Sequence, residues 1–405
     1  MPVVPHIDAD ERRRRLLVRH HLVRPAATVE QVAADMVGLH STDPATVVLS
    51  LQARLDPFAV ADLEDALYER RTLLRMLAMR RTMFVVPLDL AAVMNVSCTR
   101  ALVPVERRKL VALLEEGGVT GDVDAWIERV GDETVAALRA HGPLPASQLT
   151  KLVPELSGQL RVAVGKKYEG LIGVSTRMLF LLAAEARIAR ARPLGTWLSS
   201  QYRWAPMDDW IGRLPNVGEV AARAELVRRW LRAYGPGTLD DLVWWTKWTK
   251  ANVRAALSGV GAVAVTTDTG DDPAAPAWVA PDDLDTTPRD LAAPDGVEPV
   301  ALLPALDPTI MGWKHRGWYL GPHRAALFDR TGNAGPTVWA GGRAVGAWSQ
   351  TEDGAVVTRL LEDVDRDAAV RVDAAAQRLT EWMAGVRVTP RFPTPLDRAI
   401  AAGSA

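Results

Sequence analysis

The stretch that decides the fold is Tyr234-Gly235-Pro236-Gly237-Thr238, followed by Leu239-Asp240-Asp241-Leu242-Val243-Trp244-Trp245. The glycine-proline turn ends an amphipathic helix predicted over residues 220–234, and Thr238 starts the next helix. A further helix is predicted over 249–257, and strands are predicted over 260–267 and 277–280. Helices in this order with a β-hairpin after them are typical of a helix-turn-helix unit with a wing.

The same order of elements recurs twice nearer the N-terminus. The helices and wing strands of the middle copy are predicted over residues 132–141, 145–149, 178–184 and 187–191. The helices of the first copy are predicted over 11–23, 29–39, 44–55 and 60–70, and a short helix or turn and a strand ending at Pro87 follow them. This repetition predicts three tandem winged-helix units, over residues 1–105, 106–205 and 206–285.

The pattern changes beyond a linker rich in Asp, Pro and Gly that runs from Pro281 to Pro299. Short strands separated by hairpin signals are predicted over 300–303, 324–328, 337–339, 343–348 and 355–361. A final helix is predicted over 366–383. The expected fold class is therefore α+β, with three tandem winged-helix (helix-turn-helix) units and a small C-terminal β-barrel-like domain over 286–405.

The composition is that of an ordinary globular protein, with 48% hydrophobic and 24% charged residues. A length of 405 residues exceeds what one hydrophobic core usually holds and predicts two to four domains. Neither a membrane-spanning stretch nor a secretory signal is recognisable, so a cytoplasmic protein without membrane association is expected. Cys98 is the single cysteine, which excludes a disulfide within the chain and a cysteine-based zinc cluster.

Two clusters of cations stand out in a chain whose net charge is −1. The first predicted helix carries Arg12 to Arg15 and Arg19, and a solvated face or a phosphate-binding face explains this cluster equally well. In the third unit, Lys247, Lys250 and Arg254 recur at spacings of three and four residues on one face of the candidate recognition helix. The predicted contacts to double-stranded DNA are Arg75 and Arg81 near the first wing, with Lys247, Lys250 and Arg254. Ordinary surface ion pairs are the alternative.

An imidazole and a hydroxyl stand directly before a helix start in His40-Ser41-Thr42-Asp43-Pro44. Asp43 can accept hydrogen bonds from free N–H groups of the first turn, and Pro44 suits the first helical position because it has no N–H. Such an entrance can aim side chains into a cleft, although these residues also fit a plain connection between two helices. Glycine-rich phosphate loops, a nucleophile elbow and metal-ligand spacings are absent from the sequence, so neither a metal nor a cofactor is expected.

Four motifs occur in order along the chain. They are Gly38–Ala45, Arg80–Phe84, Tyr234–Thr238 with Asp241–Trp245, and Leu302–Pro308. With them, the sequence resembles the bacterial winged-helix DNA glycosylase family over nearly its whole length, from about residue 10 to residue 400. The resemblance implies three tandem winged helices and a C-terminal β-domain that form a clamp around duplex DNA. It also implies removal of alkylated or crosslinked purines without a metal or a covalent lysine intermediate.

The catalytic motif of that family is Gln-x-Gln, and the resemblance places His40 at its first glutamine position and Thr42 at its second. An alkylated purine is a cationic leaving group, so the site must chiefly position a water and stabilise an oxocarbenium-like sugar. Neutral His40 can orient or deprotonate that water, and Thr42 can hydrogen-bond to the water or the deoxyribose. Asp43 can offer negative charge near the sugar or only cap the helix. The motif contains no lysine, so a Schiff-base lyase step is not expected.

These residues predict a monofunctional glycosylase that acts as a monomer on double-stranded DNA in the repair of alkylation damage. Because both glutamines are replaced, a non-catalytic winged-helix DNA-binding protein, serving as a regulator or in damage recognition, is the alternative. A scaffold that uses winged helices for protein contacts fits the net charge of −1 and forms a third hypothesis.

Overall fold

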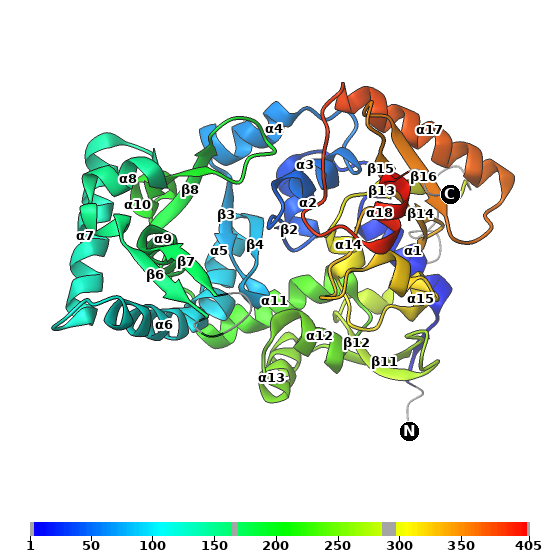
Figure 1. The fold of residues 1–405 in the computed structure, drawn as a ribbon. Helices are drawn as coiled ribbons and strands as arrows, with labels where there is room; N and C mark the ends of the chain where they lie inside the picture. Colours follow the sequence, from blue (N-terminus) through cyan, green and yellow to red (C-terminus); the bar gives the residue numbers. More distant parts are fainter. Residues whose placement is uncertain (1–3, 164, 166–168, 286–296, 403–405) are drawn as a thin grey trace. The chain divides into compact units, whose positions relative to one another are not determined.

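The computed structural model describes residues 4–163, 165, 169–285 and 297–402, which form two compact units (Figure 1). Unit 1 joins the chain up to Leu63 with the chain from Arg223 onward, and unit 2 is Glu64–Ala222. The four consecutive segments predicted from the sequence therefore differ from the compact units. The reason is long-range packing inside unit 1, where helices near the N-terminus share one core with the C-terminal part of the chain.

Unit 1 contains mostly short helices. They are α1 (Ala9–Arg19), α2 (Val29–Asp35), α3 (Pro44–Gln52), α12 (Leu239–Thr246), α13 (Lys250–Val260), α14 (Pro308–Met311), α15 (Gly317–Leu320), α16 (Arg324–Leu327), α17 (Arg366–Met383) and α18 (Pro395–Ala401). In sequence, α4 (Val60–Glu64) and α11 (Glu219–Tyr234) run across the boundaries between the units. The short strand β2 (Leu39–His40) lies between α2 and α3.

Unit 1 also contains two four-stranded sheets. The first has the order β1-β11-β12-β10, with β1 (His6–Ile7), β10 (Gly237–Thr238), β11 (Val263–Thr267) and β12 (Ala275–Val279). The second has the order β13-β14-β15-β16, with β13 (Val300–Leu303), β14 (Thr337–Ala340), β15 (Arg343–Gln350) and β16 (Val356–Leu360). The first sheet pairs β1 in parallel with β11, whereas the neighbours in the second sheet are all antiparallel.

The elements predicted around Gly235-Pro236-Gly237 are confirmed as helices α11, α12 and α13 and the hairpin β11–β12. Helix α12 begins with a capping box, in which the Thr238 hydroxyl accepts from the N–H of Asp241 (3.1 Å) and the Asp241 carboxylate accepts from the N–H of Thr238 (3.0 Å). Gly237 lies against the ring of Trp230, and a Cβ at this position would come within 2.2 Å of that ring. The turn therefore requires a glycine. The tandem repetition of three winged helices remains a prediction.

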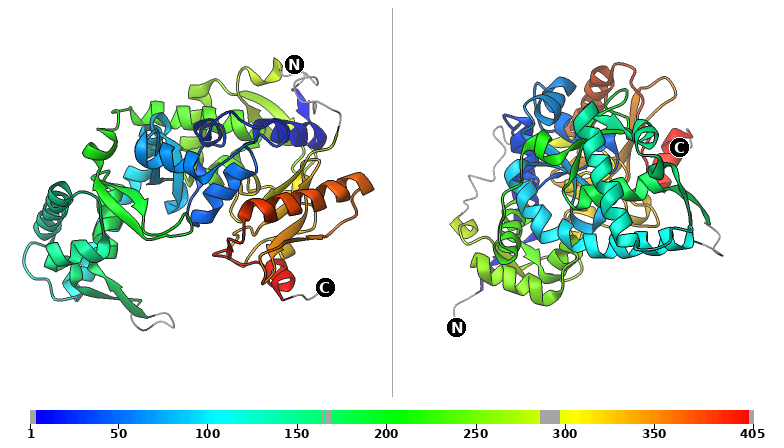
Figure 2. Two further views of the ribbon diagram at one scale, coloured as in Figure 1. Left: turned by 90° about the horizontal axis from the view of Figure 1, so that it is seen from above. Right: turned by 90° about the vertical axis from the view of Figure 1, so that its left-hand side faces the viewer.

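The C-terminal domain is an open sheet, which corrects the predicted barrel-like closure. Among the described residues, β13 and β16 are the two edges of the sheet and do not pair with each other. The amphipathic helix α17 packs against β13 and β16, and α18 packs against β15 (Figure 2). A four-stranded meander covered by helices buries its apolar residues without closing, so closure is not required.

Unit 2 combines short and long helices with small sheets. Its helices are α5 (Leu88–Met94), α6 (Val103–Glu116), α7 (Val123–His141), α8 (Ala146–Leu152), α9 (Val174–Ala184) and α10 (Met207–Ile211). Its strands are β3 (Leu73–Leu77), β4 (Met83–Pro87), β5 (Leu144–Pro145), β6 (Gln159–Val162), β7 (Gly170–Gly173), β8 (Ile188–Pro193) and β9 (Tyr202–Pro206). The strands pair as the hairpins β3–β4 and β6–β7 and as the sheet β5-β9-β8.

Three local predictions are wrong. Residues 178–184 belong to helix α9 rather than to a wing strand, because Val174, Met178 and Leu182 place one buried face on a helix. Residues 324–328 include the short helix α16 and are not a strand. Residues 73–77 form strand β3, where a helix or turn was expected. All three are short apolar runs, in which periodicity alone does not separate helix from strand.

One helical stretch, Leu88–Glu116, is long and apolar enough to cross a membrane by length and composition alone. More than half of its most apolar window is buried inside the protein, as expected for a core helix. The predicted linker 281–299 lies partly outside the described residues.

Asp397 in the first turn of α18 makes the stability of the C-terminal domain sensitive to pH. Burial raises the pKa of Asp397 to about 6, although hydrogen bonds from Thr394 oppose the shift. An unfolded aspartate has a pKa of about 3.9, so the folded state binds more protons between these values and loses stability as the pH rises through that window. The stability of D397N relative to wild type should therefore increase from about pH 4 to pH 6 and stay constant above.

Urea unfolding monitored by tryptophan fluorescence at several pH values tests this prediction. D367N, at an exposed position in the first turn of α17, is the matched control. A difference between D397N and wild type that does not change with pH would contradict the assignment.

Candidate functional site at the entrance of helix α3

The segment His40-Ser41-Thr42-Asp43 connects strand β2 to helix α3, so the predicted helix entrance is present. Asp43 is the N-cap, and its Oδ1 accepts a hydrogen bond from the N–H of Ala45 at 3.1 Å. Pro44 occupies the first helical position, where no N–H is needed. The capping role predicted for Asp43 is confirmed.

The four side chains of the entrance differ in exposure. Ser41 and Asp43 are buried, whereas His40 and Thr42 are half-buried. The Nδ1 atom of His40 and the Oγ1 atom of Thr42 are covered by protein, and Thr42 Oγ1 has no hydrogen-bond partner among the described residues. An unpaired buried hydroxyl costs about 1–3 kcal/mol, so a water that reached the Thr42 hydroxyl would relieve this cost.

A segment near the C-terminus closes one side of the entrance. This segment, residues 384–394 between α17 and α18, is called the strap. The backbone N–H of Arg391 donates to Asp43 Oδ2 at 3.1 Å, and the Arg391 guanidinium Nη1 donates to the carbonyl of Thr42 at 3.2 Å. The amide of Gln350 on β15 fixes the strap further, because it accepts from the N–H of Val388 and donates to the carbonyl of Val386. Both oxygens of Asp43 are thus engaged in structural hydrogen bonds.

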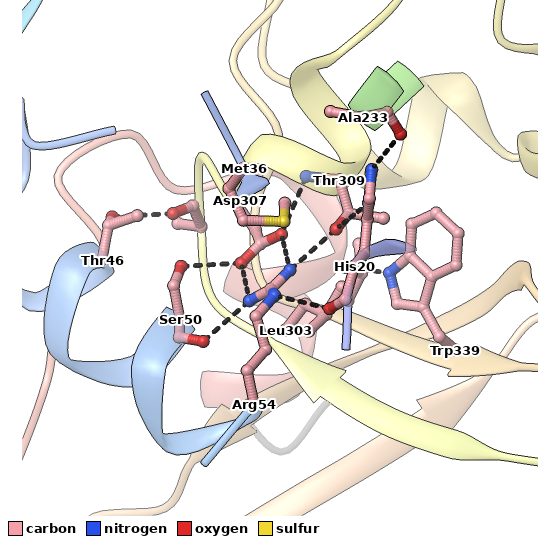
Figure 3. A network of polar contacts seen from close by, with 12 residues as sticks. His20, Met36, Thr46, Ser50, Arg54, Ala233, Leu303, Asp307, Thr309 and Trp339 are labelled. Atoms are coloured by element: carbon pink, nitrogen blue, oxygen red, sulfur yellow. Dashed lines mark hydrogen bonds and ion pairs between the residues drawn. The ribbon is translucent and has the colours of Figure 1, made fainter. Parts of the chain in front are cut away.

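The C-terminal end of helix α3 is held by a buried ion pair between Arg54 and Asp307 (Figure 3). Both side chains are fully buried, and two hydrogen bonds of 2.7 and 2.9 Å join them. Arg54 also donates to the carbonyls of His20 and Ser50 and to the Thr309 hydroxyl. Burial alone would raise the pKa of Asp307, but Arg54 and the hydrogen bonds from Ser50 and Thr309 outweigh burial and hold that pKa below its ordinary value.

His20 is a structural histidine in the same network. Its Nδ1 lies 2.9 Å from the Thr309 hydroxyl, and its Nε2 lies 3.1 Å from the carbonyl of Ala233. Burial, assisted by the charge of Arg54, lowers the pKa of His20 to about 3. The ring is therefore neutral at physiological pH and adds no charge to this network.

Three arginines of the basic helix α1 are engaged inside unit 1, whereas Arg14 is exposed. The Arg12 guanidinium is buried 4.0 Å from the ring centre of Trp318 and donates to the carbonyl of Pro236. Arg15 and Arg19 form ion pairs with Asp283. These three side chains have partners inside unit 1, so neither a solvated face nor a phosphate-binding face describes them; for the exposed Arg14 both explanations stay predictions.

The predicted DNA-contact residues of unit 1 are exposed, but one lies elsewhere than expected. Lys247 ends α12 in the left-handed region (φ 61°) and is not part of the following helix. Lys250 and Arg254 share α13, and Lys250 lies 3.7 Å from the carboxylate of Asp240. All three side chains are accessible to solvent.

The two predicted DNA contacts of unit 2 differ from each other. Arg75 is buried with its guanidinium over the ring of Tyr202, so it has no surface to offer DNA, and this prediction is wrong for the present structure. Arg81 stays partly exposed, forms an ion pair with Glu106 at 2.8 Å and lies over the ring of Phe180. Sequence alone did not show that Tyr68 and Tyr202 lie beside Arg75, because they come from other elements.

Sequence reasoning missed Arg391, and also Arg54, as residues that hold the candidate site. Arg54 is separated from its partner Asp307 by 253 residues, and Arg391 from Thr42 by 349. The motif Leu302–Pro308 was the one available signal, since it contains Asp307. Among the described residues, three or more His, Cys, Asp or Glu side chains do not gather anywhere as a potential metal site.

The structure defines the class of this protein: it is an α+β protein that carries a polar motif at a rigid helix entrance. The model of the AlkZ-like DNA glycosylases matches residues 33–382, and the chain belongs to this family. The solved structure of the DNA glycosylase AlkZ from Streptomyces sahachiroi is similar, with a TM-score of 0.66 over 91% of this chain and 96% of that one. The two sequences are 18% identical, so this likeness concerns the fold. A search of curated proteins found no match.

Removal of the Asp307 charge should strongly destabilise unit 1. In D307N the buried Arg54 loses its counter-charge, which typically costs about 3–5 kcal/mol. The free energy of unfolding from urea titrations measures this cost. R232Q breaks the exposed Arg232–Asp282 pair and should cost under about 1 kcal/mol. Equal losses of unfolding free energy in the two variants would show that the buried pair stabilises the protein no more than the exposed pair does.

Loss of the Asp43 side chain should weaken the helix entrance. D43A removes both the cap on α3 and the acceptor for the strap, and the cap alone is worth about 1–2 kcal/mol. D43N keeps one acceptor oxygen and should lose less stability than D43A. Unfolding titrations of both variants check this order, and a D43A variant as stable as wild type would refute the structural role of Asp43.

Proposed function

We propose that this protein is a monofunctional DNA glycosylase that hydrolyses the N-glycosidic bond of N7- or N3-alkylated, or crosslinked, purines in double-stranded DNA. The observation that carries the proposal is the Thr42 hydroxyl, which lacks a hydrogen-bond partner among the described residues and lies two residues from half-buried His40. Membership of the AlkZ-like DNA glycosylase family supports the reaction class. The resemblance of the sequence motif to that of the family implies that His40 and Thr42 stand at the positions of its catalytic glutamines.

The proposed chemistry relies on the lesion for much of its driving force. An alkylated purine already carries positive charge, so the bond between its nitrogen and C1′ breaks with little help from an acid. The Thr42 hydroxyl orients the water, and His40 accepts a proton from it as the oxygen bonds to C1′. The purine leaves with the electron pair of the broken bond and becomes neutral. Asp43 only holds the entrance, because hydrogen bonds from Ala45 and Arg391 occupy its two oxygens.

A purine does not need to enter a deep pocket in this scheme. The cavity lined by Asp43, Thr46 and Gln350 has a volume of about 20 Å³. This volume accommodates about one water, which is much smaller than a base. Neither His40 nor Thr42 lines this cavity, so it does not hold the purine. The scheme needs only access of C1′ to the water, which bulky or crosslinked adducts also allow.

DNA binding is proposed to use helical units with wings. The order α11, α12, α13 and the hairpin β11–β12 is the order of such a unit, and α13 would present Lys250 and Arg254 to the groove. Lys247 and Arg81 are proposed as phosphate contacts because both are accessible cations at turns. The protein is proposed to act as a monomer.

Base release from duplexes that contain 7-methylguanine or a bulkier N7 adduct tests the activity. H40A should lower the single-turnover rate by about 10²–10⁴-fold, the range for loss of a general base. T42V keeps the shape but removes the hydroxyl, and should lower the rate by about tenfold because one hydrogen bond is lost. T42S should retain most of the activity, and D43N should release base at nearly the wild-type rate.

DNA affinity, measured by fluorescence anisotropy, is the control for each variant and should not change. A second candidate function is non-catalytic DNA binding, favoured by the replacement of both glutamines by His40 and Thr42. Intact binding without release from either substrate would exclude the glycosylase and support that second function.

A further inference from the structure

The side chain of Arg391 is an exposed cation held at the candidate site. Its Nη1 donates to the carbonyl of Thr42 at 3.2 Å, while its backbone N–H donates to Asp43. The guanidinium carries five N–H donors in all. Within the described part of the chain, no carboxylate forms an ion pair with this side chain, and its ring contact is with Phe392, whose ring centre lies 5.9 Å from the guanidinium carbon.

This lack of a counter-ion distinguishes Arg391 from several other arginines of unit 1. Arg12, Arg15 and Arg19 are neutralised or bound within the core of unit 1. On the surface of the same unit, Arg343 binds Glu362 and Arg228 binds Glu225. The nearest carboxylate to the Arg391 backbone, that of Asp43, is already occupied by two backbone N–H groups.

We propose that Arg391 binds a backbone phosphate of the DNA substrate beside the nucleotide that lies at His40 and Thr42. A planar guanidinium with free donors matches the oxygens of a phosphate. The phosphate would bring the negative charge that Arg391 lacks as a partner. The proposal rests on the proposed function, because it assigns a DNA contact to the same site.

The contact also connects substrate binding to the position of the motif. The guanidinium that meets the phosphate is the one that holds the Thr42 carbonyl, and the neighbouring backbone N–H holds the cap of α3. A bound phosphate would therefore fix the distance between the DNA backbone and Thr42. Arg391 acts on the reaction as a positioning residue rather than as a catalytic one.

Salt-dependent binding tests the proposal without any need for turnover. The probe is a duplex with a tetrahydrofuran abasic site, which cannot release a base. Loss of one phosphate contact lowers the slope of log K against log salt by about 0.9, so R391Q should show this decrease and a several-fold weaker affinity. R391K keeps the charge and should keep most of the slope. The backbone hydrogen bond to Asp43 persists in both variants, and thermal unfolding verifies that they fold.

The matched control is R387Q, which removes one exposed charge from the same strap. Among the described residues, Arg387 makes no hydrogen bond to the motif. The slope of log K against log salt for R387Q should therefore equal that of wild type. An unchanged slope in R391Q, or an equal decrease in R387Q, would overturn the assignment.

Rates of base release separate this proposal from the proposed function. If wild-type protein releases base, R391Q at saturating enzyme should react several-fold more slowly, and R391K should restore part of the rate. A slower R391Q with an unchanged salt slope would show that the side chain only supports Thr42, which overturns the phosphate contact. If wild type releases no base but R391Q still loses slope, the activity fails while the phosphate contact stands.

Discussion

The buried ion pair between Arg54 and Asp307 is the constraint on which unit 1 depends. It joins the end of α3 to the start of α14, two segments separated by 253 residues, and it also fixes His20 and Thr309 (Figure 3). Removing both charges from water carries a large desolvation free energy. It is offset because each carboxylate oxygen and the guanidinium have several hydrogen-bond partners. Such a fully satisfied network tolerates one geometry, so it sets the position of α3.

The candidate site inherits its rigidity from this network. One end of α3 is bound to Asp307, and the other end carries the entrance, where Asp43 caps the helix and receives the strap. His40 and Thr42 therefore stand directly before a helix that is held at both ends. A site that must place one water near a sugar carbon benefits from this preorganisation, since small displacements are costly in rate.

The distribution of arginines explains how a protein proposed to bind DNA has a net charge of −1. Many of its arginines serve the structure: Arg12 lies on Trp318, Arg15 and Arg19 bind Asp283, and Arg75 lies over Tyr202. Counting cations along the sequence therefore overstates the surface available to DNA. The accessible cations without a strong counter-charge are the informative ones, and they are recognised only when the partners are known.

The sequence by itself determined the local elements and the family. The turn Gly235-Pro236-Gly237, the capping of α12 and α3, and the helix over 366–383 follow from residues that are neighbours in the chain. Short apolar runs such as 178–184 were assigned wrongly, because their periodicity fits either a helix or a strand. The ordered motifs identified the DNA glycosylase family, which the match over residues 33–382 confirms.

The tertiary structure alone decided which charges are available and what holds the site. The pairing of Arg54 with Asp307, the burial of Arg75 and the hydrogen bond from Arg391 to Thr42 join residues from distant parts of the chain or from separate elements. Local sequence encodes backbone preference through steric fit and capping, which act over a few residues. Burial and ion pairing depend on distances in space, and these are set only when the whole core has packed.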